Sequence, residues 1–256
     1  MASGEDCTDS RLRSKVRNMS RLSQQYLSAR RHSDYVVLEG FHPIKHAWRQ
    51  GLEVTELYTH LPEQIIRTST RLSPDLTARF SRAQTLSRAE FQSLSPHYVK
   101  TGIIGLAHKP AYTLDQILAG DGYAVYLDEV RNLNNLGAIV RTLAARGVAG
   151  LLYSGTLDVW HPKCVSIARG LQLALPVVPV EQLPETPGRE IIGFDERGEL
   201  LRPGTLPENA ILAFGSERTG LAPATRARLS RTVRIPMQPE ISSLNLATAV
   251  AIGVYS

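Results

Sequence analysis

Short apolar runs alternate with stretches of helical periodicity along most of the chain. Apolar runs of about four to eight residues that end near Gly, Pro or a polar cluster are typical of buried strands. They occupy residues 35–40, 54–60, 101–109, 123–130, 150–155, 176–180, 190–196, 210–217 and 232–237. Helical periodicity marks residues 43–51, 138–147, 163–174, 224–230 and 243–256, and two pieces within 63–94 that break around Ser73 and Pro74. This alternation predicts an α/β protein with a mostly parallel sheet and helices on both of its faces.

The same pattern divides the chain into segments. Residues 1–33 form a basic polar leader, and residues 34–110 are predicted to form a small α/β domain. Residues 111–122 are predicted to be a linker with one short helix, and residues 123–256 a second, larger α/β domain. A chain of 256 residues is long enough for two modest domains of this kind.

The charge of the chain suits a nucleic-acid partner. The formal net charge is +5, the pI is about 9.4, and most of the positive charge is arginine. A guanidinium group can pair with phosphate in two places and stack on an exposed base, so this composition favours RNA without requiring it. Arg11 and Arg13 in the leader are candidate contacts to RNA phosphates. The leader is either a basic arm of this kind or a solvated tail.

Several classes of protein are disfavoured by what the sequence lacks. No apolar run reaches the ~18 residues of a membrane-spanning helix, and the first residues do not resemble a secretory signal. Cys7 and Cys164 are the only cysteines and form no CxxC pair, so we expect neither a disulfide framework nor a structural zinc site. We expect a cytoplasmic protein with no metal and no membrane partner.

Three loops that follow predicted strands carry the residues most suited to chemistry. They are residues 134–142, 214–221 and 235–250, and each is rich in small side chains. In open parallel sheets, ligands bind beyond the carboxyl ends of the strands, which is where these loops begin. None of the loops matches the glycine fingerprint of dinucleotide-binding proteins, the P-loop or the nucleophile elbow of α/β-hydrolases.

Together, the three loops resemble the signature motifs of the SpoU/TrmH family of SPOUT RNA methyltransferases. The first motif corresponds to NLGAIVR at residues 135–141, and the second to GSERTG at residues 215–220. The third corresponds to IPM at residues 235–237 and SLN at residues 243–245. The resemblance covers residues 120–256, and residues 34–110 are more faintly similar to the ribosomal-protein-like RNA-binding domain of the family.

The resemblance implies a knotted (trefoil) SPOUT domain that uses S-adenosyl-L-methionine to methylate a ribose 2′-hydroxyl of a structured RNA, with rRNA favoured over tRNA. It also implies a homodimer, because family sites are built at the interface of two subunits. On the family pattern, the catalytic residues are Arg141, Asn135, Glu217, Ser243 and Asn245. The cofactor-binding residues are Gly215, Ile235, Met237 and Leu244. Arg169 and Lys45 are candidate RNA contacts.

The family assigns the activating role to its first-motif arginine, here Arg141. A free guanidinium is a poor base at neutral pH. Arg141 is therefore either a base in a strongly altered environment or a group that orients the hydroxyl and stabilises the developing alkoxide. The chain departs from the family pattern at Asn132-Leu133, at Pro239 and at Arg169, and these departures bear on substrate choice.

The sequence leaves other functions open. Within the same fold they are a tRNA 2′-O-methyltransferase, a methyltransferase that modifies a base, and a catalytically silent RNA-binding or ribosome assembly factor. The intact motif residues argue against the silent factor. A nucleotide-dependent oxidoreductase is the alternative from another class, and the missing glycine fingerprint argues against it.

Overall fold

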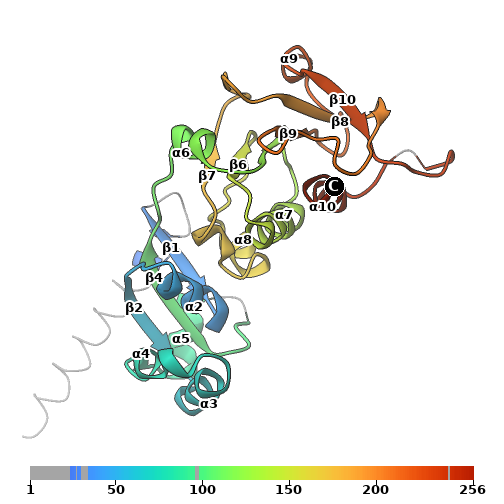
Figure 1. Cartoon of the computed structure of the whole chain (residues 1–256). Coiled ribbons are helices and arrows are strands. Elements are labelled where there is room, and N and C mark those ends of the chain that lie inside the picture. Colours follow the sequence, from blue (N-terminus) through green and yellow to red (C-terminus); the bar gives the residue numbers. More distant parts are fainter. Residues whose placement is uncertain (1–23, 27, 30–33, 96–97, 242) are drawn as a thin grey trace, which may run out of the picture. The chain divides into compact units, whose positions relative to one another are not determined.

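The computed structural model describes residues 24–256 except residues 27, 30–33, 96–97 and 242 (Figure 1). The predicted RNA contacts Arg11 and Arg13 lie outside the described residues. The chain divides into two compact units, the first ending at Lys109 and the second running from Pro110 to Ser256. No helix among the described residues has the length and apolar character needed to span a membrane.

The first unit is built on a four-stranded sheet with the order β1-β4-β2-β3. Strand β4 is antiparallel to both β1 and β2, and the short β3 runs parallel to β2. Its elements are β1 (Tyr35–Glu39), α2 (Phe41–Arg49), β2 (Val54–Thr59), α3 (Pro62–Leu72), the 3-10 turn η1 (Pro74–Leu76), α4 (Thr77–Phe80), β3 (Gln84–Thr85), α5 (Arg88–Leu94) and β4 (Ile103–His108).

The prediction of two helical pieces within residues 63–94 was wrong. The chain does break at Ser73, but three helices, a 3-10 turn and a two-residue strand fill this region. Strand β3 forms because Gln84 and Thr85 pair with the end of β2, a contact that local periodicity does not report. Helix α5 begins at a capping box in which the Ser87 hydroxyl accepts from the Glu90 amide and the Glu90 carboxylate accepts from the Ser87 amide.

The second unit contains a six-stranded sheet with the order β10-β8-β9-β5-β6-β7. All of its strand pairs are parallel, so the prediction of a mostly parallel sheet is confirmed. The strands are β5 (Ala124–Leu127), β6 (Gly150–Tyr153), β7 (Val177–Pro179), β8 (Ile191–Leu200), β9 (Ile211–Phe214) and β10 (Arg231–Arg234). The helical elements are α6 (Leu114–Ala119), α7 (Leu133–Arg146), α8 (Pro162–Ile167), the 3-10 turn η2 (Leu171–Leu173), α9 (Pro223–Arg226) and α10 (Leu246–Tyr255).

Alternate residues of the central strand β5 point to two hydrophobic cores. Val125 and Leu127 pack in a cluster with buried side chains of α7, α8 and α10. Ala124 and Tyr126 pack in another cluster that contains Ile117 of α6. Because successive strand residues face opposite sides of a sheet, these two clusters place helices on both faces, as the sequence predicted.

Helix α7 begins earlier than its predicted start at residue 138. It starts at Leu133 because the Asn132 side chain accepts a hydrogen bond from the Asn134 amide at 2.8 Å and caps the helix. Asn135 therefore lies on the helix rather than in a loop. The helix ends as predicted at Gly147, which adopts the left-handed conformation (φ 71°) that glycine accommodates.

The other two long predicted helices of the second unit are shorter than expected. Residues 163–174 form α8 and η2 instead of one helix, because Arg169 takes a positive φ of 58° between them. The last helix, predicted from residue 243, starts at Leu246 because the Asn245 side chain accepts from the amides of Ala247 and Thr248. Ser243 and Leu244 are therefore in the loop before the helix.

Arg189 links the segment from α6 to β5, at the start of the second unit, to the loop before β9. Its guanidinium donates to the carbonyls of four residues, namely Leu118, Gly120, Gly122 and Asn209. One arginine thus supplies donors to the half-buried end of α6 and to the loops before β5 and β9. Burial lowers the pKa of Arg189.

Candidate active site

The first two motif loops leave the sheet side by side. Strands β5 and β9 are parallel neighbours, and their last residues, Leu127 and Phe214, are directly paired. The segment that leads into α7 follows β5, and residues 215–220 follow β9. Both loops therefore start at the same carboxyl edge of the sheet, where parallel α/β folds bind ligands.

A chain of side-chain hydrogen bonds joins all three motifs. Nδ2 of Asn135 donates to Oε1 of Glu217, and Nδ2 of Asn245 donates to Oδ1 of Asn135 at 3.0 Å. Asn135 is 8% exposed and lies between the other two residues. The structure thus brings together three of the five predicted catalytic residues, one from each motif.

The second motif is a closed loop. Ser216 and Gly220 form an antiparallel bridge, with their amides donating to each other's carbonyls at 3.2 and 3.0 Å. A Cβ atom added at Gly215 would lie 2.0 Å from the carbonyl carbon of Gly220, so only glycine fits at residue 215. The loop leaves the Glu217 and Arg218 side chains exposed at its tip.

Asp128, which the sequence reasoning missed, anchors the far end of this loop. Its carboxylate is buried, accepts from the Ala222 amide at 2.7 Å and accepts from the Tyr126 hydroxyl at 3.2 Å. The Tyr126 hydroxyl oxygen also lies 3.1 Å from the Ser154 hydroxyl. The available signal was an acidic residue directly after the apolar run of β5, where an unpaired carboxylate would be costly to bury.

The remaining residues predicted from the motifs do not join this chain of hydrogen bonds. Arg141 has an exposed side chain on α7 and makes no hydrogen bond or ion pair with another described residue. Ser243 is exposed, and so is Leu244 at 36%. Ile235 and Met237 are half-buried, and Ile235 packs against the core that contains α7 and α10.

The two predicted RNA contacts within the described residues lie in different units. Arg169 is an exposed residue of the second unit, held at a positive φ between α8 and η2. Lys45 is a half-buried residue of α2 in the first unit. Among the described residues, no group of three His, Cys, Asp or Glu side chains is arranged to hold a metal ion.

Comparison with known proteins relates this chain to RNA methyltransferases along nearly its whole length. It is 28% identical over 250 residues to the 23S rRNA (adenosine(1067)-2′-O)-methyltransferase of Streptomyces laurentii, with 91% of this chain and 90% of that protein covered. It is 26% identical to the 23S rRNA (guanosine(2553)-2′-O)-methyltransferase RlmP of Bacillus subtilis, with 86% of each covered.

A solved structure shares the fold. The SpoU methyltransferase AviRb of Streptomyces viridochromogenes, in complex with AdoMet, superposes with a TM-score of 0.72 at 25% identity, over 91% of this chain and 95% of that one. The predicted α/β SPOUT fold is therefore confirmed, and the oxidoreductase alternative is set aside.

The family model described as the SpoU rRNA Methylase family matches residues 122–255, which include all three motif loops. The predicted family and the predicted enzyme class, an RNA methyltransferase, are confirmed by this match. The chain belongs to the SpoU rRNA methylase family.

Proposed function

We propose that this protein transfers a methyl group from S-adenosyl-L-methionine to a ribose 2′-hydroxyl of ribosomal RNA. The observation that carries the proposal is the hydrogen-bonded chain Asn245–Asn135–Glu217, which assembles the three motif loops at the carboxyl edge of the sheet. The two relatives described above, which act on 23S rRNA and align over more than four-fifths of this chain, favour rRNA over tRNA. We also propose that the enzyme works in the cytoplasm, where it would meet this substrate.

The residues around the second and third motifs fit the cofactor. At Gly215 two backbone segments lie so close together that no side chain would fit between them. Ile235 and Met237 are half-buried apolar residues that follow β10 at the carboxyl edge of the sheet. An adenine ring needs a flat apolar slot and a few backbone hydrogen bonds, and Leu244 in the exposed loop before α10 supplies a further apolar surface. When bound, the cofactor supplies an electrophilic methyl group on a sulfonium.

The chain's own residues must hold the ribose oxygen in line and stabilise the charge that develops as its proton leaves. Arg141 suits the second task because its guanidinium is exposed and has no partner among the described residues, so it is available to an RNA phosphate or to the ribose. Asn135 is a positioning residue that fixes the Glu217 carboxylate. Ser243 offers an exposed hydroxyl to the ribose.

Replacing Arg141 by Ala tests the proposed chemistry. We expect methyl incorporation into rRNA to fall by about 100-fold or more, the usual effect of removing a group that stabilises developing negative charge. Cofactor affinity, measured by calorimetry, is expected to stay within about twofold of the wild type. Arg197→Ala, which removes an exposed arginine of β8 that belongs to none of the three motifs, is the matched control.

The same experiment separates the alternatives. A wild-type protein that does not bind S-adenosylmethionine would indicate the silent assembly factor. Methylated nucleosides that carry the group on a base, or on tRNA, would contradict the ribose or rRNA assignment. Mapping of ribose methylation in total RNA with and without the gene identifies the modified nucleotide.

We also propose a homodimer, supported by helix α10. Its ten residues include no charged side chain, and it packs on α7 and β9 within the unit. Thr248, Ala251 and Tyr255 form a stripe at helical spacing that this packing leaves exposed or half-buried, and Tyr255 is 62% exposed. A helix with no charged side chain on any face is normally covered on both sides, and a second copy of the chain would provide that cover.

The path of the last segment supports the knot that the family implies. Strand β10 is at one edge of the sheet, yet α10, which follows it, packs on α7 and on β9. The chain therefore crosses back from the edge past the second-motif loop, as a C-terminal trefoil knot requires. We propose that residues 235–241 and 243–245 pass through that loop.

A further inference from the structure

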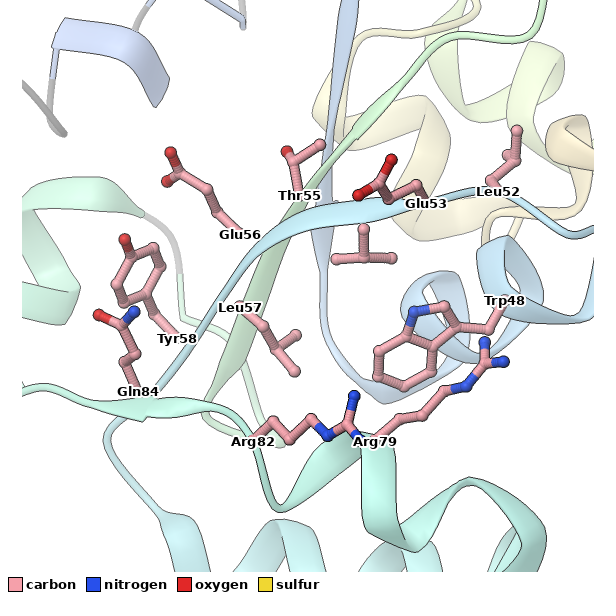
Figure 2. Close-up of a pocket in the computed structure, with 11 residues that line it drawn as sticks. Trp48, Leu52, Glu53, Thr55, Glu56, Leu57, Tyr58, Arg79, Arg82 and Gln84 are labelled. Atoms are coloured by element: carbon pink, nitrogen blue, oxygen red, sulfur yellow. The ribbon is translucent and has the colours of Figure 1, made fainter.

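The first unit has a pocket that the motif loops do not explain. It has a volume of about 430 Å³, which falls in the ~300–1,000 Å³ range of small-ligand sites. Figure 2 shows that it runs along β2 and receives the side chains of Trp48 from α2, Arg79 from α4 and Arg82 from the segment after α4.

The indole of Trp48 is held rigidly at this pocket. It meets the ring of Phe80 edge-on with centroids 4.7 Å apart, and Phe80 stacks on Phe41 at 4.8 Å. Both phenylalanines are fully buried, so their packing holds the indole in place on its core side. On the pocket side, the Arg79 guanidinium lies 5.8 Å from the centre of the indole ring. Arg79 thus lies over the indole ring, and its exposed, flexible side chain can turn from the ring to a phosphate when a planar, electron-rich base takes its place.

The strand that borders the pocket has an open edge. On one side β2 pairs with β4, but on the other β3 reaches only Tyr58 and Thr59. Within the described residues, the stretch from Val54 to Leu57 has no strand partner on that side, so its backbone donors and acceptors are available to a ligand.

The charges of the pocket are separated. Arg79 and Arg82 are exposed and lie on the Trp48 side of β2, whereas Glu53 and Glu56 point away on the other side, as Figure 2 shows. A phosphate is therefore drawn to the side that also carries the aromatic ring. A base stacked on an aromatic side chain with its phosphate on arginine is the usual way in which proteins hold single-stranded RNA.

We propose that this pocket binds one unstacked nucleotide of the RNA substrate, with the base against Trp48 and the phosphate on Arg79 and Arg82. The proposal rests on the proposed function in that the RNA is the substrate of the enzyme. An extended peptide added to the edge of β2 is the competing occupant. Two guanidinium groups beside a fixed indole match a phosphate and a base better than they match a peptide strand.

Tryptophan fluorescence tests the site in the full-length chain. The protein has two tryptophans, so Trp160→Phe leaves Trp48 as the only reporter. We expect a single-stranded RNA hexanucleotide to quench this fluorescence. In the double variant Arg79→Ala/Arg82→Ala, the affinity is expected to fall by about tenfold or more and to depend less steeply on salt. Arg71→Ala, which removes an exposed arginine of α3 that does not line the pocket, is the matched control.

Methylation assays add an independent readout. The double variant should raise the KM for RNA and leave kcat and cofactor affinity unchanged, and Trp48→Phe, which keeps a flat ring, should retain most of the affinity. Failure to bind cofactor would refute the proposed function alone, because the quenching measurement needs no methyl transfer. RNA binding without quenching, an affinity loss no larger than that of Arg71→Ala, or quenching by a short extended peptide instead of RNA would overturn the pocket assignment.

Discussion

A side-chain amide can donate two hydrogen bonds and accept two, so one asparagine can connect several groups at once. Asn135 uses this capacity between Glu217 and Asn245, which are 82 and 110 residues away in the chain. Asn245 uses its other atom, Oδ1, to cap α10. A change at Asn135 therefore reaches both partner loops and, through Asn245, the start of the last helix.

Asn135→Ala should lower both stability and activity. Glu217 and Asn245 each lose a hydrogen-bond partner, and because both residues are exposed, water can take its place, so we expect a loss of about 0.5–1.5 kcal/mol, the usual net contribution of a hydrogen bond. Urea denaturation followed by circular dichroism measures the change in the free energy of unfolding. Asn134→Ala, at the exposed neighbouring asparagine, is the control and should change neither quantity. An Asn135→Ala enzyme as stable and active as this control would contradict the role assigned to the amide.

Asn135, Glu217 and Asn245 could be identified from the sequence because each occupies a fixed place in one of the three motifs. The sequence did not reveal that their side chains bond to one another, since that depends on the pairing of β5 with β9 and on the return of α10. Asp128 and Arg189 were missed altogether. Each of them bonds to backbone groups of distant segments, and although an acidic residue at the end of the β5 run marks Asp128 as unusual, no local pattern tells which group either residue contacts.

At the scale of the element, helix α2 concentrates positive charge. Lys45, His46 and Arg49 lie within one turn, and His42 is one turn earlier. Burial, followed by the charges of Lys45, His42 and Arg49, lowers the pKa of His46 from 6.5 to about 4. The histidine is thus neutral in the folded unit at pH values where the unfolded chain would protonate it.

The stability of the first unit should therefore depend on pH in a defined direction. Because the folded pKa is below the unfolded one, the unfolded chain binds more protons between about pH 6.5 and pH 4. Above this window His46 is uncharged in both states and does not change the free energy of unfolding. As the pH falls through the window, the free energy of unfolding decreases, because protons bind preferentially to the unfolded chain. Thermal melts between pH 7.5 and 4.5 should show a smaller loss in His46→Gln than in the wild type. Identical profiles would mean that His46 does not titrate as described.

Element positions were predicted better than element ends. Apolar runs located every long strand, because burial on both faces of a sheet leaves a strong signal. The ends depend on single residues, such as the cap at Asn132 and the positive φ of Arg169, which interrupts residues 163–174. A glycine such as Gly147 indicates a possible left-handed backbone conformation from the sequence alone. An arginine in that conformation, such as Arg169, gives no such indication.

At the scale of the whole molecule, the proposed homodimer depends on contacts made by the stripe of Thr248, Ala251 and Tyr255 on α10. Ala251→Arg places a charge in the middle of this stripe, and burying it against a second copy would be strongly unfavourable. Light scattering should show a dimer for the wild type and a monomer for the variant, with methyl transfer lost alongside. Ala227→Arg, the same change at an exposed alanine beside α9, should stay dimeric. An active wild-type monomer would contradict the proposed dimer.

The order of strands in the second unit also bears on how the chain is made. Strand β9 lies between β5 and β8, although it is synthesised after both of them. While the ribosome has not yet released residues 211–214, the emerging β5 has β6 on one side and an open apolar edge on the other. Such an edge can pair with other nascent chains. Translation pauses before residue 211 would prolong this exposure, so synthesis through β9 should be the step at which the newborn protein depends most on chaperones.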